Sequence, residues 1–588
     1  MRWLAATAGV AVGIALGRWL SRKHAILRLR LRVAAVSSRT LALTNMRVPV
    51  GLLTSSFRNR MRADPEGLVL CDVGVDVASG QISSIDPPGT LTSGARIDGR
   101  GSVLTSCWTD AHTHLVKTHA HPRCRNPTGS ISDALAVECD DQPRWAQCPC
   151  CGPVAFNGGT GEEQGAKDED AACTPCPIHK TDVFRRMDFA LQSAYHHGTR
   201  AVRTHLDGTN NTEDANLRET VYGAFEMCRK KWGARGLQLQ GVANLYLPLW
   251  RDAELAKKHV AEAVSHDGVL LGAYCGNVAT TPEAETAEAL DALFAHAHAH
   301  NLQVDLHIDE TNDPNCCCML RLVSSLRRAR DAGYVQPVLL GHCTSFALQS
   351  EAVRGQVIDG LRALSPLSVI CNPSTNLGLQ DRRGSAAPHC VPVEAETPRT
   401  PIWRGITLIQ ELAAVGLRVG AASDNVRDWW HPYGDYDALQ NWRGAITLAH
   451  LDTAPNEGAW AHLVSDSPAA AIGCHPSATP FVADNGASFA KGAVADLVWF
   501  PDAKRLSELF SRPEVAERIV LRRGRVQDSR LPSYDEIEDL MSPPTKLKSV
   551  GSVVDRGATT APKKAKAKGF TLSDSTDQHF GKDSDDSD

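Results

Sequence analysis

The chain has 588 residues, of which 43% are hydrophobic and 22% are charged, so it can form more than one domain and has an ordinary globular composition. Its formal net charge of −5 argues against a general nucleic-acid-binding protein, which would usually be basic. The 18 cysteines are scattered along an enzyme-sized chain, which excludes a small secreted disulfide framework and indicates mostly reduced, buried thiols.

Residues 1–40 differ in composition from the rest of the chain. No Asp or Glu precedes Asp64, whereas Arg and Lys are frequent, and the apolar stretch 3–17 ends at Arg18. That stretch is shorter than the ~20 residues that cross a bilayer comfortably. An acid-free, Arg-containing terminus is typical of a chloroplast or mitochondrial transit peptide, and an apolar stretch with basic flanks is typical of a membrane anchor. Organelle targeting and membrane anchoring are therefore both expected alternatives, and a functionless extension of a cytoplasmic protein is the third.

Two segments that flank the middle of the chain have the pattern of short strands. Residues 41–101 alternate short apolar runs with turns, and residues 481–532 contain two further apolar runs, 493–500 and 519–524. We predict that these segments together form a small β-sandwich beside the central domain. Residues 541–588 are rich in Pro, Lys, Ser and Asp and contain too little apolar surface to offset the cost of ordering, so we predict a disordered tail.

Eight short apolar runs lie between these flanks, in residues 102–480. The runs are 103–114, 199–207, 237–245, 268–275, 302–310, 336–344, 367–376 and 417–426. Helical patterns such as 281–300 and 405–414 separate several of them. Alternating strands and helices predict a parallel sheet of the α/β class, and eight such units predict a closed (β/α)8 TIM barrel.

Six of these eight runs end in polar residues that are uncommon at the end of a buried strand. They are Asp110, His112 and His114; Arg203, His205 and Asp207; His307, Asp309 and Glu310; His342 and Thr344; Asn372 and Asn376; and Ser423, Asp424 and Asn425. The carboxyl ends of the strands form the catalytic face of such barrels. The pattern therefore predicts an enzyme whose active site lies at that face.

His112 and His114 are two residues apart on a predicted strand, so both side chains point to the same face and can bind one ion. The pair is a weak signal by itself, because this spacing also arises by chance. It gains weight from His307, His342 and Asp424 at other strand ends. Three neutral imidazoles and one carboxylate suit zinc or ferrous iron, whereas magnesium favours oxygen ligands. One divalent metal, zinc or iron, is the predicted cofactor.

The ordered set of motifs resembles the cytosine deaminase branch of the metal-dependent amidohydrolase superfamily over roughly residues 41–530. The motifs are Asp110-Ala-His-Thr-His, Val202-Arg-Thr-His-Leu-Asp, Asp305-Leu-His-Ile-Asp-Glu, Gly341-His-Cys-Thr, Asn372-Pro-x-x-Asn376 followed by Leu379-Gln, and Ser423-Asp-Asn-Val-x-Asp-x-Trp. The resemblance implies these roles: His112, His114, His307 and Asp424 hold the metal, Glu310 shuttles protons, and His342 hydrogen-bonds the attacking water or the developing oxyanion without ligating.

The same resemblance implies a hydrolase that acts on carbon–nitrogen bonds other than peptide bonds, in cyclic amidines. A metal-bound hydroxide attacks the amine-bearing carbon of a cytosine-like or other aminated nitrogen heterocycle, and ammonia or an amine departs. Hydrolysis of a cyclic or linear amide is an alternative, because the same hydroxide would serve. A catalytically inactive ligand-binding barrel is a further alternative, which the complete set of ligands and the proton shuttle disfavour.

The assignment of the proton shuttle does not follow from strand geometry. Strict alternation places His307 and Asp309 on one face of their strand and Glu310 on the other. Glu310 can face the metal only if the strand ends before it and the chain turns there. The resemblance therefore favours Glu310, whereas alternation alone favours Asp309.

The residues expected to bind the substrate depart from the family pattern at two positions. Cytosine deaminases carry a Gln after the third strand that reads the pyrimidine edge, and the matching position here is Tyr246. Asn425 follows the metal-binding Asp, where a second Asp is usual. A change from carboxylate to amide replaces an acceptor with a mixed donor and acceptor. We therefore predict that Tyr246 and Asn425 read a ring edge different from that of cytosine.

Other residues near the strand ends are weaker candidates for the lining of the pocket. Lys117 is similar to a lysine of relatives that act on aminated triazines and would pair with an anionic or enol-like substrate oxygen; a solvated loop lysine is the alternative. His205, Trp429, Trp430 and Tyr433 line the pocket in one interpretation and serve ordinary packing in the other. The expected partner is a small heterocyclic substrate and not nucleic acid; membrane association and homo-oligomerisation are left open.

Residues 139–180 form a predicted insertion after the first barrel strand. The insertion contains Cys148-x-x-Cys151 and Cys173-x-x-Cys176, and paired elements of this kind are typical of a tetrahedral zinc site. A second, structural zinc would pin a Gly-rich loop that lacks a core of its own. Disulfides and unstructured chain are the alternatives.

Overall fold

The computed structural model describes residues 23, 25–36, 38–148, 152–153, 177–211, 213–382, 400–453, 455–473 and 488–541. The predicted targeting segment 1–40 is therefore described only in part, and the predicted tail lies outside the described residues except for Met541. Within the part of the chain that the structure describes, no helix is both long enough and apolar enough to cross a membrane.

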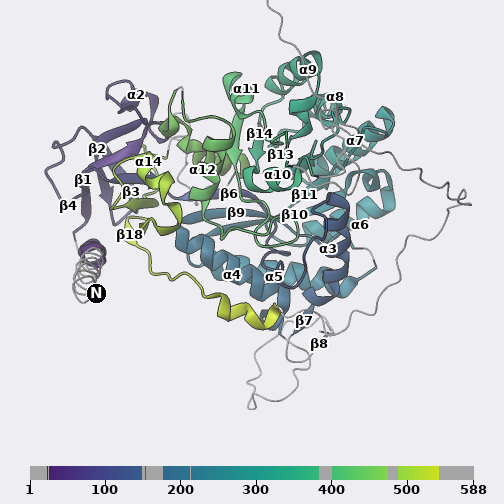
Figure 1. Ribbon diagram of the computed structural model, residues 1–588, viewed down its shortest axis with the longest axis horizontal. Coiled ribbons are helices and arrows are strands. Elements are labelled where there is room, and N and C mark those ends of the chain that lie inside the picture. Colours follow the sequence, from purple (N-terminus) through teal and green to yellow (C-terminus); the bar gives the residue numbers. More distant parts are fainter. Residues whose placement is uncertain are drawn as a thin grey trace, which may run out of the picture. The chain divides into compact units, whose positions relative to one another are not determined.

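The predicted (β/α)8 barrel is confirmed by one parallel sheet of eight strands (Figure 1). In sheet order its strands are β6 (Trp108–Thr113), β9 (Thr199–His205), β10 (Gln238–Tyr246), β11 (Val269–Tyr274), β12 (Val304–Ile308), β13 (Val338–His342), β14 (Leu367–Cys371) and β15 (Arg418–Ala421). A parallel bridge between Thr113 and Asp424 joins the first strand to the chain after the last one. Every residue of β6, β9, β12, β13 and β14 is buried, as expected for parallel strands that are covered on both faces.

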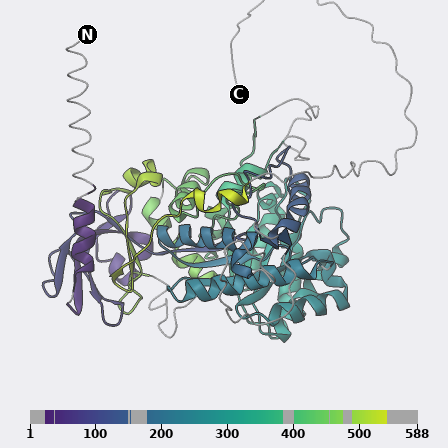
Figure 2. The ribbon, with the colours of Figure 1, turned by 90° about the horizontal axis from the view of Figure 1, so that it is seen from below.

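Helices follow the barrel strands and lie along the outside of the sheet (Figure 1, Figure 2). They include α4 (Asp182–His197), α5 (Ala215–Gly233), α6 (Ala253–Val264), α7 (Glu283–Ala299), α8 (Cys318–Asp331), α9 (Glu351–Arg362), α11 (Ile409–Ala414) and α12 (Ala438–Leu448). Local sequence sets their ends: α4 begins where the Thr181 side chain accepts a hydrogen bond from Phe184 N, and it ends at Gly198, whose φ of 102° suits glycine.

A second eight-stranded sheet contains strands from both ends of the described chain, as predicted for the flanking domain. Its strands are β1 (Thr40–Pro49), β2 (Leu68–Asp76), β3 (Gln81–Asp86), β4 (Ala95–Asp98), β5 (Val103–Ser106), β16 (Leu497–Phe500), β17 (Ile519–Arg522) and β18 (Arg525–Val526). The two ends meet where β5 pairs antiparallel with β16, with Thr105 opposite Val498. The flanking segments thus complete one sheet together.

The predicted run 103–114 is not one barrel strand, and this part of the prediction was wrong. The structure divides it into β5 of the flanking sheet and β6 of the barrel. The chain changes partners at Cys107, whose N–H donates to Asp496 O, whereas the N–H of Trp108 donates to Gly198 O. Both strands are buried at every position, so the run stays apolar across the change of sheet and its periodicity does not reveal it.

The predicted insertion begins inside a helix, α3 (Ile131–Trp145), which follows β6. A short hairpin of β7 (Gln147–Cys148) and β8 (Gly152–Pro153) follows α3, and the short helix η2 (Ile178–Lys180) leads into α4. Cys148 is buried, whereas Cys151, Cys173 and Cys176 lie outside the described residues. The structural zinc therefore stays a prediction.

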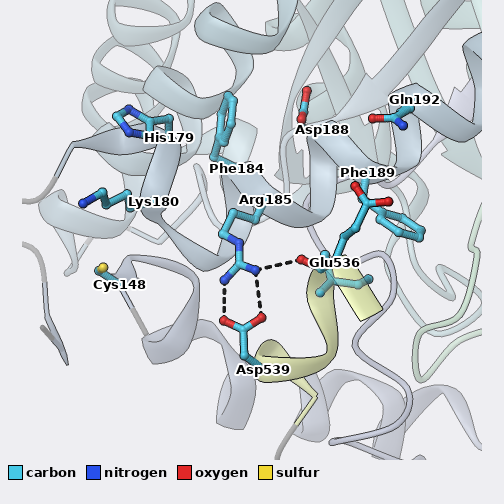
Figure 3. Close-up of a pocket in the computed structure, with 11 residues that line it drawn as sticks. Cys148, His179, Lys180, Phe184, Arg185, Asp188, Phe189, Gln192, Glu536 and Asp539 are labelled. Carbon is cyan, nitrogen blue, oxygen red and sulfur yellow. Dashed lines mark hydrogen bonds and ion pairs between the residues drawn. The ribbon is translucent and has the colours of Figure 1, made fainter. Parts of the chain in front are cut away.

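The last described segment, η7 (Tyr534–Leu540), lies against α4 (Figure 1, Figure 2). Its apolar side packs on Phe189, and Arg185 of α4 forms an ion pair with Asp539, with N–O distances of 2.5 and 2.7 Å (Figure 3). A cavity of about 430 Å³ lies between η2, α4 and η7, and Cys148 is the only described residue of the predicted sites that lines it. The other predicted site residues that the structure describes lie at or just beyond the carboxyl ends of the barrel strands.

Arg123, in the loop between β6 and α3, joins three separate parts of the chain. Its buried guanidinium contacts Asp141 of α3 at 2.7 and 3.0 Å, Asp182 of α4 at 2.5 and 3.1 Å, and the carbonyl oxygen of Leu540 at 3.0 Å. Burial acts to raise the pKa of Asp182, but Arg186 and Arg123 outweigh it and hold that pKa at about 2. One cation thus fixes α3 against α4 and the C-terminal segment.

We expect the Arg123→Met variant to lose about 3–5 kcal/mol of unfolding free energy, because it leaves the buried Asp141 carboxylate without its cation and leaves Asp182 with Arg186 alone. Urea unfolding followed by circular dichroism measures the loss. Arg185→Met is the matched control: its ion pair with Asp539 is 26% and 51% exposed and should contribute about 1 kcal/mol or less. Equal losses in the two variants would contradict the role assigned to Arg123.

Candidate metal centre

Three histidines and one aspartate converge at the carboxyl ends of the barrel strands. His112 lies in β6 and His114 directly after it, His307 lies in β12, and Asp424 lies in the turn after β15. His114 Nε2 lies 3.1 Å from His307 Nε2 and 3.3 Å from Asp424 Oδ1, and His112 Nε2 lies 3.6 Å from the same oxygen. All four side chains are buried. The structure thus brings together the four predicted metal ligands.

The atoms of this cluster fit a divalent metal. His112 Nε2 and both carboxylate oxygens of Asp424 are buried and have no hydrogen-bond partner within the described part of the chain. Buried polar atoms without partners are costly, and a cation at their centre would satisfy them. Ligands bonded at about 2.0 Å in a tetrahedral site lie roughly 3.3 Å apart, close to the 3.1–3.6 Å separations observed here.

The surroundings of the histidines set their protonation. Burial, and then the neighbouring His205, hold the pKa of His112 and that of His307 well below the ordinary value. Both rings are therefore neutral, as a metal ligand must be. Burial also acts to lower the pKa of His114, but the carboxylate of Asp207 outweighs it and raises that pKa to about 9. A metal must displace the proton of His114 in order to bind.

Asp207, just beyond the end of β9, orients one of the ligands. Its Oδ2 lies 2.8 Å from His114 Nδ1, so a ring that ligates through Nε2 donates its other N–H to this carboxylate. Its Oδ1 lies 3.5 Å from Lys117 Nζ. Asp207 ends the motif Val202-Arg-Thr-His-Leu-Asp, but no role for it follows from the sequence. Its position two residues after His205, at a strand end, could have indicated that Asp207 lies near the metal ligands.

We expect Asp207→Asn to weaken metal binding by about 10- to 100-fold, because the amide is a poorer acceptor for the N–H of the ligating His114. Competition with a coloured chelator measures the affinity. Asp267→Asn, at a position whose side chain is 87% exposed, makes the same chemical change and should leave the affinity unaltered. An unchanged affinity in Asp207→Asn would show that this contact does not tune the ligand.

His205 lies behind the cluster rather than in the cavity. Its Nε2 is 3.3 Å from His112 Nδ1, the ring nitrogen that faces away from Asp424. Asp305 Oδ1 lies 3.7 Å from His205 and 3.9 Å from His112, and Arg203 donates to the other oxygen of Asp305 at 3.0 Å. Of the two interpretations of His205, the structure favours buried packing, here directly against a predicted ligand.

The backbone after β12 explains how Glu310 reaches the cavity. The strand ends at Ile308, and Asp309 has a φ of 53°, which reverses the alternation that would have pointed Glu310 away. Glu310 Oε1 lies 3.3 Å from His342 Nδ1. Asp309 instead turns to α8 and accepts hydrogen bonds from Cys318 N at 2.9 Å and from the side chain of Gln349 at 3.2 Å. Burial raises the pKa of Glu310, and the nearby His342 acts against it.

A cavity opens onto the cluster and receives most of the other candidates. It is lined by His114, Lys117, Leu135, Glu138, Asp207, Asn210, Asn244, Tyr274, His307, Glu310, His342, Asp424, Asn425 and Trp430. Tyr246 is not in the lining: it lies at the end of β10, is 43% exposed, and has its ring 6.1 Å from that of Tyr274. Asn244 and Tyr274 occupy the wall where a substrate-reading Tyr246 was expected.

Two of the candidate aromatic residues do not line this cavity. Trp429 is buried and stacks on Trp145 of α3, with ring centroids 6.5 Å apart, and Tyr433 is 72% exposed. Trp430 does line the cavity, as one interpretation of the sequence expected. Trp429 therefore packs in the core, whereas Trp430 belongs to the site.

Lys117 is not a solvated loop lysine, because its side chain is 5% exposed and closely surrounded. Its Nζ lies 3.3 Å from Glu138 Oε2, 3.5 Å from Asp207 Oδ1 and 4.9 Å from the centre of the Trp430 ring. Burial acts to lower the pKa of Lys117, but Asp207 and Glu138 outweigh it and raise that pKa, so the ammonium stays charged. Glu138 lies in a helix without a motif, which is why the sequence did not reveal it.

Comparisons of the sequence with known proteins agree with this geometry. The model of the amidohydrolase family matches residues 261–526. The pterin deaminase of Rhizobium rhizogenes is 34% identical over 478 residues, which cover 81% of this chain and 92% of that protein. The N-isopropylammelide isopropyl amidohydrolase of Pseudomonas sp. strain ADP is 22% identical over 344 residues, which cover 58% of this chain and 68% of that protein.

Two solved structures with the same fold are similar to this chain over most of its length. The 5-methylcytosine deaminase of Klebsiella pneumoniae gives a TM-score of 0.59 at 20% identity, covering 84% of this chain and 97% of that one. The N-isopropylammelide isopropylaminohydrolase of Burkholderia multivorans gives 0.55 at 18% identity, covering 83% and 97%. At these identities the likeness establishes the fold.

Proposed function

Since the chain belongs to the metal-dependent amidohydrolase superfamily, we propose that it hydrolytically deaminates an aminated nitrogen heterocycle of the pterin kind. The observation that carries the proposal is the convergence of three imidazoles, one carboxylate and a separate buried carboxylate, Glu310, on one cavity. The 34% identity to a pterin deaminase supports a pterin ring rather than cytosine. The departure from the cytosine deaminase pattern at Asn425, which lines the cavity, supports the same choice.

The metal ligands in this proposal are His112, His114, His307 and Asp424, and zinc or ferrous iron suits three imidazoles and one carboxylate. When bound, such an ion supplies Lewis acidity and makes water a stronger nucleophile at neutral pH. Asp207 fixes the orientation of His114 through the 2.8 Å contact. The burial of the cluster keeps bulk water from competing with the substrate.

Glu310 moves the protons. Its carboxylate accepts a proton from the attacking water while the water oxygen bonds to the amine-bearing ring carbon, and it passes the proton to the adjacent ring nitrogen. It then transfers a second proton from the added hydroxyl group to the amine, so that the carbon–nitrogen bond breaks and ammonia leaves. His342, held by Asn376 Oδ1 at 2.9 Å, lies beside Glu310 and hydrogen-bonds the oxygen on which negative charge develops. One water is consumed, and an oxo group replaces the amine.

Ammonia release from a panel of rings tests this function. The metal-loaded protein is offered pterin, cytosine, isocytosine, an aminated triazine, a creatinine-like ring, and cyclic and linear acyl amides. We expect the highest kcat/KM with pterin. Turnover of an acyl amide without ammonia from any ring would replace the proposal with amide hydrolysis, and a fully metal-loaded protein without any turnover would favour a ligand-binding barrel.

A further inference from the structure

Helix α3 forms one wall of the cavity and is anchored at both ends. Ser130 caps its start by accepting a hydrogen bond from Asp133 N at 3.1 Å. Near its other end, Asp141 pairs with the buried Arg123. Leu135 and Glu138, on the turns between these anchors, line the cavity. Glu138 is therefore a carboxylate held in a fixed place in the cavity that His114, His307 and Asp424 also line.

The contacts of Glu138 leave half of its carboxylate unused. Lys117 Nζ, at 3.3 Å, and Trp430 Nε1, at 3.1 Å, both contact Oε2. Within the described chain, Oε1 accepts no hydrogen bond, although a carboxylate offers about four acceptor sites. Asp207 differs, because His114 and Lys117 occupy one oxygen each. Glu138, whose side chain is 13% exposed, thus presents an available acceptor to the cavity.

Lys117 provides the complementary donor next to it. An ammonium group has three N–H donors, and the contacts with Glu138 and Asp207 use two of them. The third is free to donate to a substrate. Lys117 Nζ lies 3.3 Å from Glu138 Oε2, so the free donor and the free oxygen Oε1 belong to neighbouring groups. A donor and an acceptor side by side match a ring edge on which a carbonyl and an N–H are neighbours.

We propose that Glu138 is a specificity-determining residue that accepts a hydrogen bond from a ring N–H of the substrate, while Lys117 donates to the neighbouring carbonyl. The pair selects aminated heterocycles that carry a lactam edge, as a 2-amino-4-oxo ring does. The inference rests on the proposed deaminase function and narrows its substrate class. A site built to hydrogen-bond a ring N–H rejects analogues that lack it, because its own polar groups are then left unpaired.

The test pairs a variant with a substrate analogue. The metal-loaded wild-type protein and Glu138→Ala are each assayed for ammonia release from pterin and from a pterin methylated on the lactam nitrogen, which lacks the N–H. We expect the wild type to prefer pterin by about 10- to 100-fold in kcat/KM, the range for a hydrogen bond to a charged group. In Glu138→Ala the preference should vanish through a higher KM for pterin, with kcat and metal content little changed.

Two further variants serve as controls for a purely structural role of Glu138. Glu138→Gln keeps an acceptor oxygen in the same shape and should restore part of the preference, which a role in helix stability alone would not explain. Asp140→Ala, at an exposed position of the same helix, should retain the full wild-type preference. An undiminished preference in Glu138→Ala, with ammonia release intact, would overturn the inference and leave the deaminase function standing. Wild-type protein that releases no ammonia from any ring would overturn both.

Discussion

Replacing Asp424 with alanine is expected to remove bound metal and ammonia release together. Asp424 is the one carboxylate in the predicted ligand set, and its two buried oxygens have no hydrogen-bond partner among the described residues, so they depend on a cation. Alanine also removes the negative charge that balances the ion among neutral imidazoles. Elemental analysis after dialysis measures the metal, and an ammonia assay measures turnover, which should fall to background.

Asp452→Ala, the same substitution at an exposed position, controls for handling and should retain metal and activity. A thermal melt separates loss of metal from loss of fold in Asp424→Ala. Stoichiometric metal in a folded Asp424→Ala protein would remove this residue from the ligand set. It would also undermine the fit drawn from the unpartnered atoms of the cluster.

The features that the sequence predicts correctly depend on short-range rules. His112 and His114 point the same way because residues two apart on a strand share a face. His307 and Asp424 lie beside His112 and His114 because the carboxyl ends of barrel strands lie at one face. Neither rule needs knowledge of which residues pair across the sheet, so eight apolar runs, six of them with polar ends, suffice to predict the barrel.

The features that the sequence does not predict depend on contacts between distant segments. The change of sheet at Cys107 is set by hydrogen bonds to Asp496 on one side and Gly198 on the other, and no local pattern marks it. Glu138 enters the cavity because Arg123 draws α3 against α4 and the C-terminal segment. Such placements involve residues up to 417 positions apart in the chain.

The substrate-reading positions illustrate a second limit. Tyr246 matched the family pattern by its position after the third strand, yet Asn244 on the same strand lines the cavity and Tyr246 lies exposed at its end. Both residues share one face of β10, so alternation does not distinguish them. Which of the two residues lines the cavity depends on how far the cavity extends along β10. The packing of the whole barrel sets that extent.

The positive φ of Asp309 turns Glu310, and not Asp309, towards the cavity, and substitutions at the two positions test this directly. We expect Glu310→Gln to keep its metal and its fold and to lose about 10²- to 10⁴-fold in kcat, because the amide cannot accept and return a proton. Steady-state kinetics at saturating substrate, together with elemental analysis, measure both quantities. A small change in KM is expected, since the amide preserves the shape of the side chain.

Asp309→Asn is the matched partner of that experiment, one residue away. Asp309 accepts hydrogen bonds from Cys318 N, Met319 N and Gln349, so placing an amide nitrogen there should cost about 1–3 kcal/mol of unfolding free energy. Its turnover per folded molecule should stay near that of the wild type, because its side chain points to α8 and away from the cavity. The reverse result, an active Glu310→Gln and an inactive Asp309→Asn, would mean that strand alternation continues through residue 309 during catalysis. The positive φ of Asp309 makes that reverse result incompatible with the observed fold.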